Sequence, residues 1–130
     1  MARILIIDDD AELADQTAER IRPSGYEVST VNSADEVFHK IAEFQPELIL
    51  LDVMFPDNPV FGFDMARRIR RNPAYKLLPI ILLTGVNQHF PMDFSGKDID
   101  PNWMPVQDFM EKPANIPALL KRIERLLQKA

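Results

Sequence analysis

The chain has 130 residues, of which 46% are hydrophobic and 27% charged, and its net charge is -5 at pH 7. This length and hydrophobic content suit a single compact domain over residues 1–130, without an effector domain, and exclude a disordered chain. The acidic balance argues against direct binding to nucleic acid, and the lack of cysteine excludes disulfides and thiolate chemistry.

Short aliphatic segments alternate with amphipathic ones in the first half of the chain, which is typical of parallel strands joined by helices. The pattern predicts strands over residues 3–7, 26–30 and 47–51. A first helix is predicted over 11–22, with Leu13, Thr17 and Ile21 on its inner face. The sequence Ser33-Ala34-Asp35-Glu36 has the form of a capping box, so a second helix should begin there. Its inner face would carry Val37, Ile41 and Phe44.

The second half continues the alternation until residue 85. A third helix is predicted over 63–71, with four arginines (67, 68, 70 and 71) on a solvated face, followed by a strand over 79–83. A last strand is predicted over 106–111 and a last helix over 116–128. Between them, residues 86–105 carry three prolines and no helical period, so the fourth helix of an α/β fold should be shortened or replaced by a Pro-rich loop.

Polar residues stand where four of the predicted strands end. Asp8-Asp9-Asp10 follows the first strand, Asp52 the third and Thr84 the fourth, and Lys112 follows the fifth. Ligands of parallel α/β sheets bind at the carboxyl ends of the strands. Carboxylates gathered there would repel each other unless a hard divalent cation such as Mg²⁺ bound them. This chemistry suits phosphoryl transfer to a carboxylate.

Four segments, ILIIDDD, LILLDVMFP, ILLTG and FMEKP, occur in this order, each at a predicted strand end. Together they resemble the receiver domain of two-component response regulators, of the chemotaxis-receiver kind, and the resemblance spans the whole chain. It implies a flavodoxin-like, doubly wound, five-stranded parallel sheet with strand order 2-1-3-4-5. It also implies a phosphorylation-dependent signalling switch that catalyses only its own phosphorylation and slow self-dephosphorylation, and is otherwise no enzyme.

The resemblance assigns a role to each residue of the predicted site. Asp52 matches the phosphoacceptor. Asp8 and Asp9 match the acidic pair that holds Mg²⁺ together with Asp52, with Asp9 the direct ligand, and the backbone carbonyl of Met54 matches a further protein ligand. Asp10 is expected only to cap the first helix.

The family's remaining functional positions concern the phosphoryl group and the switch. Lys112 matches the lysine that contacts the acceptor and the phosphoryl oxygens, and Thr84 matches the hydroxyl that turns toward the phosphoryl group. Gly85 matches a small residue that keeps the site open. Phe109 matches the aromatic residue that swings inward after the threonine moves.

The expected partners follow from this resemblance. A sensor histidine kinase or a phosphotransfer protein would donate the phosphoryl group, and an unidentified downstream protein or a second copy in a homodimer would receive the signal. The apolar segments are too short to cross a bilayer, so we expect no membrane contact and a cytoplasmic location.

Three alternatives remain open at this point. An Asp-nucleophile phosphatase of the haloacid-dehalogenase kind would need a second acid two residues after Asp52, where Met54 stands. A flavodoxin-like module for FMN would need a phosphate-binding loop rich in Ser, Thr or Gly after the first strand. A receiver-like scaffold that is never phosphorylated would not need the full set of acceptor residues.

The sequence predicts a long-lived acyl phosphate. Polar side chains two positions after the acceptor and after the threonine often help to align water for hydrolysis, and here these positions are Met54 and Val86. Neither side chain can orient water. We expect Met54→Asn with Val86→Glu to accelerate phosphate loss, measured as decay of the phosphorylated mass. An unchanged or slower decay would contradict this reading.

Overall fold

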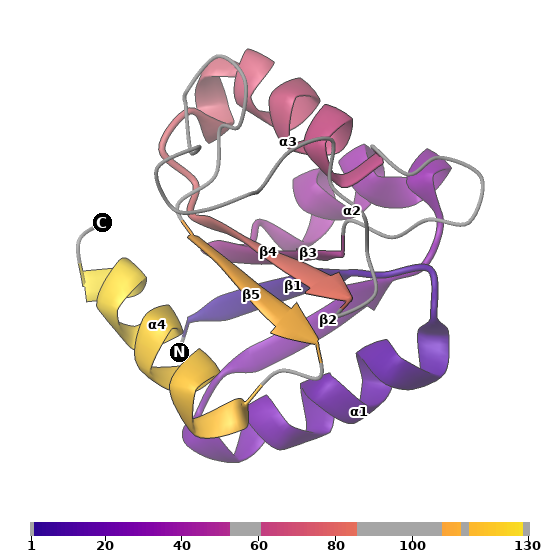
Figure 1. Ribbon diagram of the computed structural model, residues 1–130. Coiled ribbons are helices and arrows are strands. Elements are labelled where there is room, and N and C mark those ends of the chain that lie inside the picture. Colours follow the sequence, from indigo (N-terminus) through magenta and orange to yellow (C-terminus); the bar gives the residue numbers. More distant parts are fainter. Residues whose placement is uncertain (1, 53–60, 86–107, 113–114, 129–130) are drawn as a thin grey trace.

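The computed structural model describes residues 2–52, 61–85, 108–112 and 115–128. Five parallel strands form one sheet in the order β2-β1-β3-β4-β5, with helices on both faces (Figure 1). The strands are β1 (Arg3–Ile7), β2 (Glu27–Val31), β3 (Leu48–Asp52), β4 (Ile80–Gly85) and β5 (Asp108–Lys112). This order confirms the predicted doubly wound α/β class.

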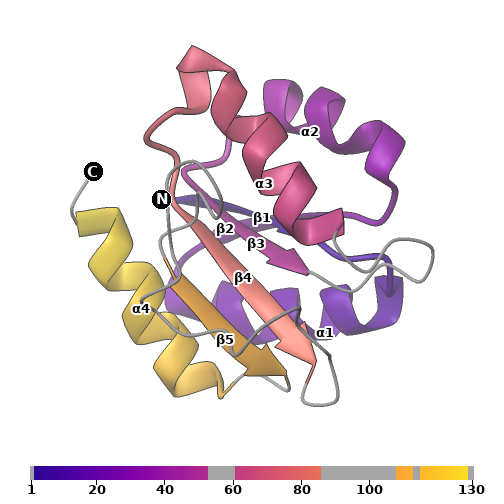
Figure 2. The ribbon, with the colours of Figure 1, turned by 45° about the horizontal axis from the view of Figure 1, so that its top comes forward.

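In the described residues, four α-helices cover the sheet. They are α1 (Ala11–Ile21), α2 (Val37–Phe44), α3 (Phe61–Arg71) and α4 (Ile116–Gln128). Helices α1 and α4 lie against one face of the sheet, and α2 and α3 lie side by side on the other (Figure 2). No helix in these described parts of the chain combines the length and apolar character needed to span a bilayer. The predicted Pro-rich loop over 86–105 lies outside the described residues.

β1 has the predicted bounds, and the other strands follow the predicted positions with shifts of one or two residues. β3 and β4 extend past their last aliphatic residue to Asp52 and Gly85, because backbone pairing continues there: Asp52 pairs with Leu83, and Gly85 with Lys112. The aliphatic pattern in the sequence locates only the buried part of each strand. The hydrogen bonds between strands join backbone groups, so they can include polar residues as well. The polar ends of these strands are therefore part of the sheet.

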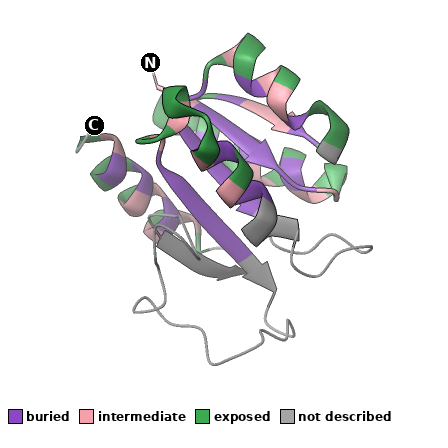
Figure 3. Ribbon diagram, turned by 90° about the horizontal axis from the view of Figure 1, so that it is seen from above, coloured by how far each residue is buried: buried purple, intermediate pink, exposed green. Residues whose placement is uncertain are grey.

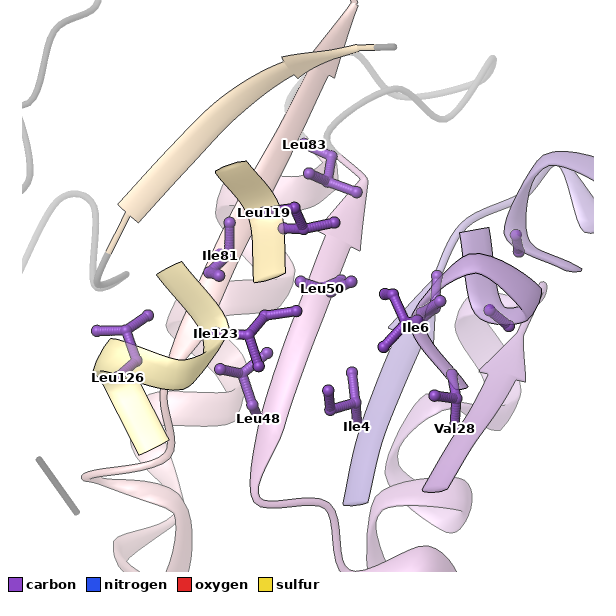
Figure 4. Close-up of a cluster of buried hydrophobic side chains, with 13 residues drawn as sticks. Ile4, Ile6, Val28, Leu48, Leu50, Ile81, Leu83, Leu119, Ile123 and Leu126 are labelled. Carbon is purple, nitrogen blue, oxygen red and sulfur yellow. The ribbon is translucent and has the colours of Figure 1, made fainter. Parts of the chain in front are cut away.

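Both faces of the sheet are buried, which explains the near-continuous aliphatic character of the strands. Alternate residues pack on opposite faces, and Figure 3 shows the central strands buried along most of their described length. On the face of α1 and α4, Leu119 and Ile123 of α4 pack in one buried cluster with strand side chains such as Leu50 (Figure 4). The last helix has the predicted bounds, and on its inner side Leu119, Ile123 and Leu126 are buried while Leu120 and Leu127 are half-buried.

The predicted inner face of α1 is wrong in part. The buried residues are Ala14, Ala18 and Ile21, whereas Leu13 and Thr17 are only half-buried. The small alanines let the helix backbone approach the sheet, and the Thr17 hydroxyl donates to the carbonyl of Leu13 at 3.1 Å. The helical spacing of Leu13, Thr17 and Ile21 predicted a stripe one residue away from the alanines that face the sheet.

The predicted capping box of the second helix is also wrong. Residues Ala34–Glu36 form a short 3-10 helix, in which the Glu36 amide donates to the Ser33 carbonyl at 3.2 Å. α2 then begins at Val37, and its capping residue Glu36 makes no side-chain hydrogen bond to it. The predicted inner face is confirmed for Val37 and Ile41, which are fully buried, and Phe44 packs at the margin of the same core.

The arginines of α3 do not form a uniformly solvated face. Arg70 is half-buried, donates to the Tyr75 carbonyl at 2.7 Å, and has its pKa lowered by burial. Arg68 lies over the Phe38 ring, 5.2 Å from its centroid. Long arginine side chains cover apolar surface with their methylenes while the charge reaches a partner. The prediction is confirmed for Arg68 and Arg71, which are exposed, and wrong for Arg67 and Arg70, which are half-buried.

Asp10 caps α1, as predicted. Its carboxylate oxygen Oδ1 accepts the Leu13 amide at 3.0 Å, and the residue is exposed. Such a bond satisfies an amide that the first turn of a helix leaves unpaired.

We expect Asp10→Ala to lower the free energy of unfolding by about 1 kcal/mol, because the Leu13 amide loses its acceptor. Asp10→Asn keeps an acceptor and should retain most of the stability. Urea unfolding of the two variants and the unmodified chain measures the difference. Equal losses in both variants would show that the cap is not the cause.

Candidate functional site

The parallel register brings the ends of the central strands to one edge of the sheet. Ile7 pairs with Leu51, so Asp8 and Asp52 are the next residues along two neighbouring strands. Asp52 pairs with Leu83, which places Thr84 one residue further along β4. Gly85 pairs with Lys112 on β5. The backbone thus places Asp8, Asp52, Thr84 and Lys112 along a single edge, as the sequence predicted.

Among the residues whose burial the structure describes, Asp8 is the only charged one that is buried, with 2% of its surface exposed. Burying a carboxylate is unfavourable unless polar groups or a cation compensate. Part of that compensation is visible, because Asp8 Oδ1 accepts the amide of Asp10 at 3.0 Å. The neighbouring Asp9 is half-buried, so it lies closer to solvent.

The three consecutive aspartates therefore occupy three different environments. Asp8 is enclosed, Asp9 is half-exposed, and Asp10 is exposed and caps α1. The capping role predicted for Asp10 is confirmed, whereas the metal-binding role of Asp8 and Asp9 stays a prediction. It arises because the chain leaves the sheet at Asp8 and enters the helix at Ala11.

Sequence reasoning missed one polar residue at this edge. Asn32 follows β2 directly, and its Nδ2 donates to the backbone carbonyl of Asp8 at 2.9 Å. The amide of Asp8 in turn donates to the Val31 carbonyl at 3.0 Å. The available signal was position: a side chain with both donor and acceptor stood at the carboxyl end of the strand beside β1.

The structure leaves part of the predicted site undescribed. It places the backbone of Asp52, Thr84, Phe109 and Lys112 but not their side chains, and Met54 lies outside the described residues. Phe109 pairs with Leu82 and lies three residues before Lys112 on β5. Among the described side chains, no group of three or more His, Asp or Glu residues could hold a metal ion.

Comparison with known proteins identifies the family. The model of the response regulator receiver domain matches residues 4–124. The chain is 31% identical over 129 residues to the DNA-binding dual master transcriptional regulator RpaA of Synechocystis, covering 99% of this chain and 50% of that protein. It is 34% identical over 135 residues to the transcriptional regulatory protein AfsQ1 of Streptomyces coelicolor, covering 96% of this chain and 54% of that protein.

Solved structures give the same answer. A CheY-like response regulator receiver domain protein from Methanospirillum hungatei superimposes with a TM-score of 0.79 at 26% identity, covering 99% of this chain and 95% of the other. The chemotaxis response regulator CheY4 of Vibrio cholerae gives 0.78 at 25% identity, covering 97% and 98%. The chain spans about half the length of the curated relatives it matches. With its strand order, its acidic edge and these matches, the chain belongs to the receiver-domain family of two-component response regulators.

Proposed function

We propose that this receiver is a Mg²⁺-dependent phosphorylation switch in which Asp52 accepts the phosphoryl group. One observation carries the proposal: the β1–β3 register makes Asp52 the neighbour of Asp8, a buried carboxylate at the edge where ligands of such sheets bind. The family match supports a phosphorylation-dependent function. The individual residue roles are our assignment.

The acidic edge fits a magnesium ion. Mg²⁺ is typically bound through one or two carboxylates, with waters and phosphate oxygens as its other ligands, so a cluster of imidazoles or thiolates is not required. Half-buried Asp9 would be the direct ligand, with Asp8, Asp52 and the Met54 carbonyl completing the protein side. The bound ion would neutralise the charge that gathers when a phosphoryl group reaches this acidic edge.

The reaction itself needs few protein groups. A carboxylate oxygen of Asp52 forms the new bond to phosphorus while the bond from phosphorus to the donor's imidazole nitrogen breaks, and its electron pair returns to the imidazole. The Lys112 ammonium and the Thr84 hydroxyl would hold the phosphoryl oxygens. Thr84 and Phe109 lie on β4 and β5, so their rearrangement would carry the signal toward that side of the sheet.

The proposed partners are proteins. A sensor histidine kinase or phosphotransfer protein would donate the phosphoryl group, and a downstream protein or a second copy would respond. Several relatives are named as DNA-binding regulators, but this chain carries a net charge of -5, which disfavours direct contact between residues 1–130 and nucleic acid. We treat these residues as one receiver domain that acts through protein contacts.

No observation favours the alternatives. The phosphatase would need a general acid where Met54 stands. Neither the family match nor the buried Asp8 carboxylate is a feature that specifically favours a flavin module or a scaffold that is never phosphorylated.

Incubation with phosphoramidate and Mg²⁺, followed by intact-mass measurement, tests the assignment. We expect the mass of one added phosphoryl group, lost in Asp52→Ala and in excess EDTA, because both the nucleophile and the cation are required. Asp35→Ala is the matched control, since it removes an exposed carboxylate from the short 3-10 helix after β2. An adduct that persists in Asp52→Ala would contradict Asp52 as acceptor.

A further inference from the structure

We infer that Asn32 is a positioning residue for the magnesium ligands, acting through the backbone of Asp8. The inference rests on the proposed function, because it concerns how the acidic turn Asp8–Asp10 is held ready for the cation. In this proposal Asn32 contacts neither the metal nor the phosphoryl group. Its effect would pass through one peptide unit.

The contact has only one chemically sensible form. A backbone carbonyl can only accept, so the Asn32 side chain must present its amide nitrogen to the oxygen of Asp8, 2.9 Å away. On the other side of the same residue, the Asp8 amide donates to the Val31 carbonyl at 3.0 Å. The end of β2 therefore holds both backbone polar groups of Asp8.

The Asp8 carbonyl belongs to the same planar peptide unit as the amide nitrogen of Asp9. Fixing this carbonyl fixes the plane in which the chain leaves the sheet toward Asp9. The next amide, that of Asp10, returns to Asp8 Oδ1 at 3.0 Å. Of these three hydrogen bonds at the turn that carries both acidic ligands, the bond from Asn32 is the one that a side chain outside the turn supplies.

A purely structural role explains Asn32 less well. The residue is exposed and adds nothing to the buried core. Pairing between β1 and β2 is complete from Arg3–Glu27 to Ile7–Val31 without its side chain. Removing the amide should leave the sheet intact and loosen mainly the peptide between Asp8 and Asp9. Groups that orient metal ligands from outside the coordination sphere commonly matter for metal affinity.

Asn72 provides a matched control at the opposite edge of the sheet. Like Asn32, it is an exposed asparagine whose side chain bonds to the backbone: its Oδ1 accepts the Ala74 amide at 2.9 Å. It lies between α3 and β4, where the strands begin. Asn72→Ala therefore removes a comparable hydrogen bond without reaching the acidic turn.

The experiment titrates Mg²⁺ into the unmodified chain, Asn32→Ala, Asn72→Ala and Asp9→Asn, following the amide resonances of residues 8–10 by NMR. Melting temperatures and the rate of phosphorylation by phosphoramidate against Mg²⁺ concentration are measured in parallel. We expect Asn32→Ala to raise the Mg²⁺ half-saturation concentration by up to about tenfold, with little change in the rate at saturating Mg²⁺. Asn72→Ala should bind Mg²⁺ like the unmodified chain, whatever its melting temperature.

The other possible outcomes distinguish failure of the magnesium site from failure of the role of Asn32. If the unmodified chain binds no Mg²⁺, or if Asp9→Asn binds it equally well, the proposed magnesium site fails and the role of Asn32 fails with it. If Asp9→Asn loses Mg²⁺ while Asn32→Ala titrates like the unmodified chain, only the inference about Asn32 is overturned. Equal weakening in Asn32→Ala and Asn72→Ala would also overturn it, by showing a general loss of stability.

Discussion

In-register backbone pairing of the parallel strands is the constraint on which the site depends. Asp8 and Asp52 are separated by a helix, a second strand and another helix, yet they become neighbours because Ile7 pairs with Leu51. A shift of one residue between β1 and β3 would also turn every aliphatic side chain of one strand toward the wrong face. The two buried faces of the sheet therefore fix the acidic edge together with the core.

The acidic turn shows how one short segment can serve two purposes. Asp10 stabilises the start of α1, while Asp8 is buried and its carboxylate accepts the backbone amide of Asp10. An enclosed carboxylate beside others is unfavourable without a counter-charge, and this unfavourable energy is what a cation would relieve. Helix capping, hydrogen bonding from the β2 end and cation binding would then act on the same three residues.

The fold and the positions of the polar strand ends could be predicted from the sequence, because strands buried on both faces form aliphatic segments whose polar ends are easy to locate. Details that depend on tertiary fit could not. Ala14 and Ala18 form the inner face of α1 because the sheet comes close, which no helical pattern reveals. Asn32 was missed because its partner is the backbone carbonyl of Asp8, just after β1, and the sequence marks only the position of Asn32 at the end of β2, not this contact.

Paramagnetic mapping with Mn²⁺ tests the central claim most directly, since Mn²⁺ accepts the same oxygen ligands as Mg²⁺ and broadens nearby resonances. At substoichiometric Mn²⁺, the amide signals of Asp8, Asp9, Asp52 and Lys112 should broaden together, while that of Asn72 at the opposite edge stays sharp. Broadening that spares Asp52 or Lys112 would contradict the account, because the strand ends would then not share one cation site.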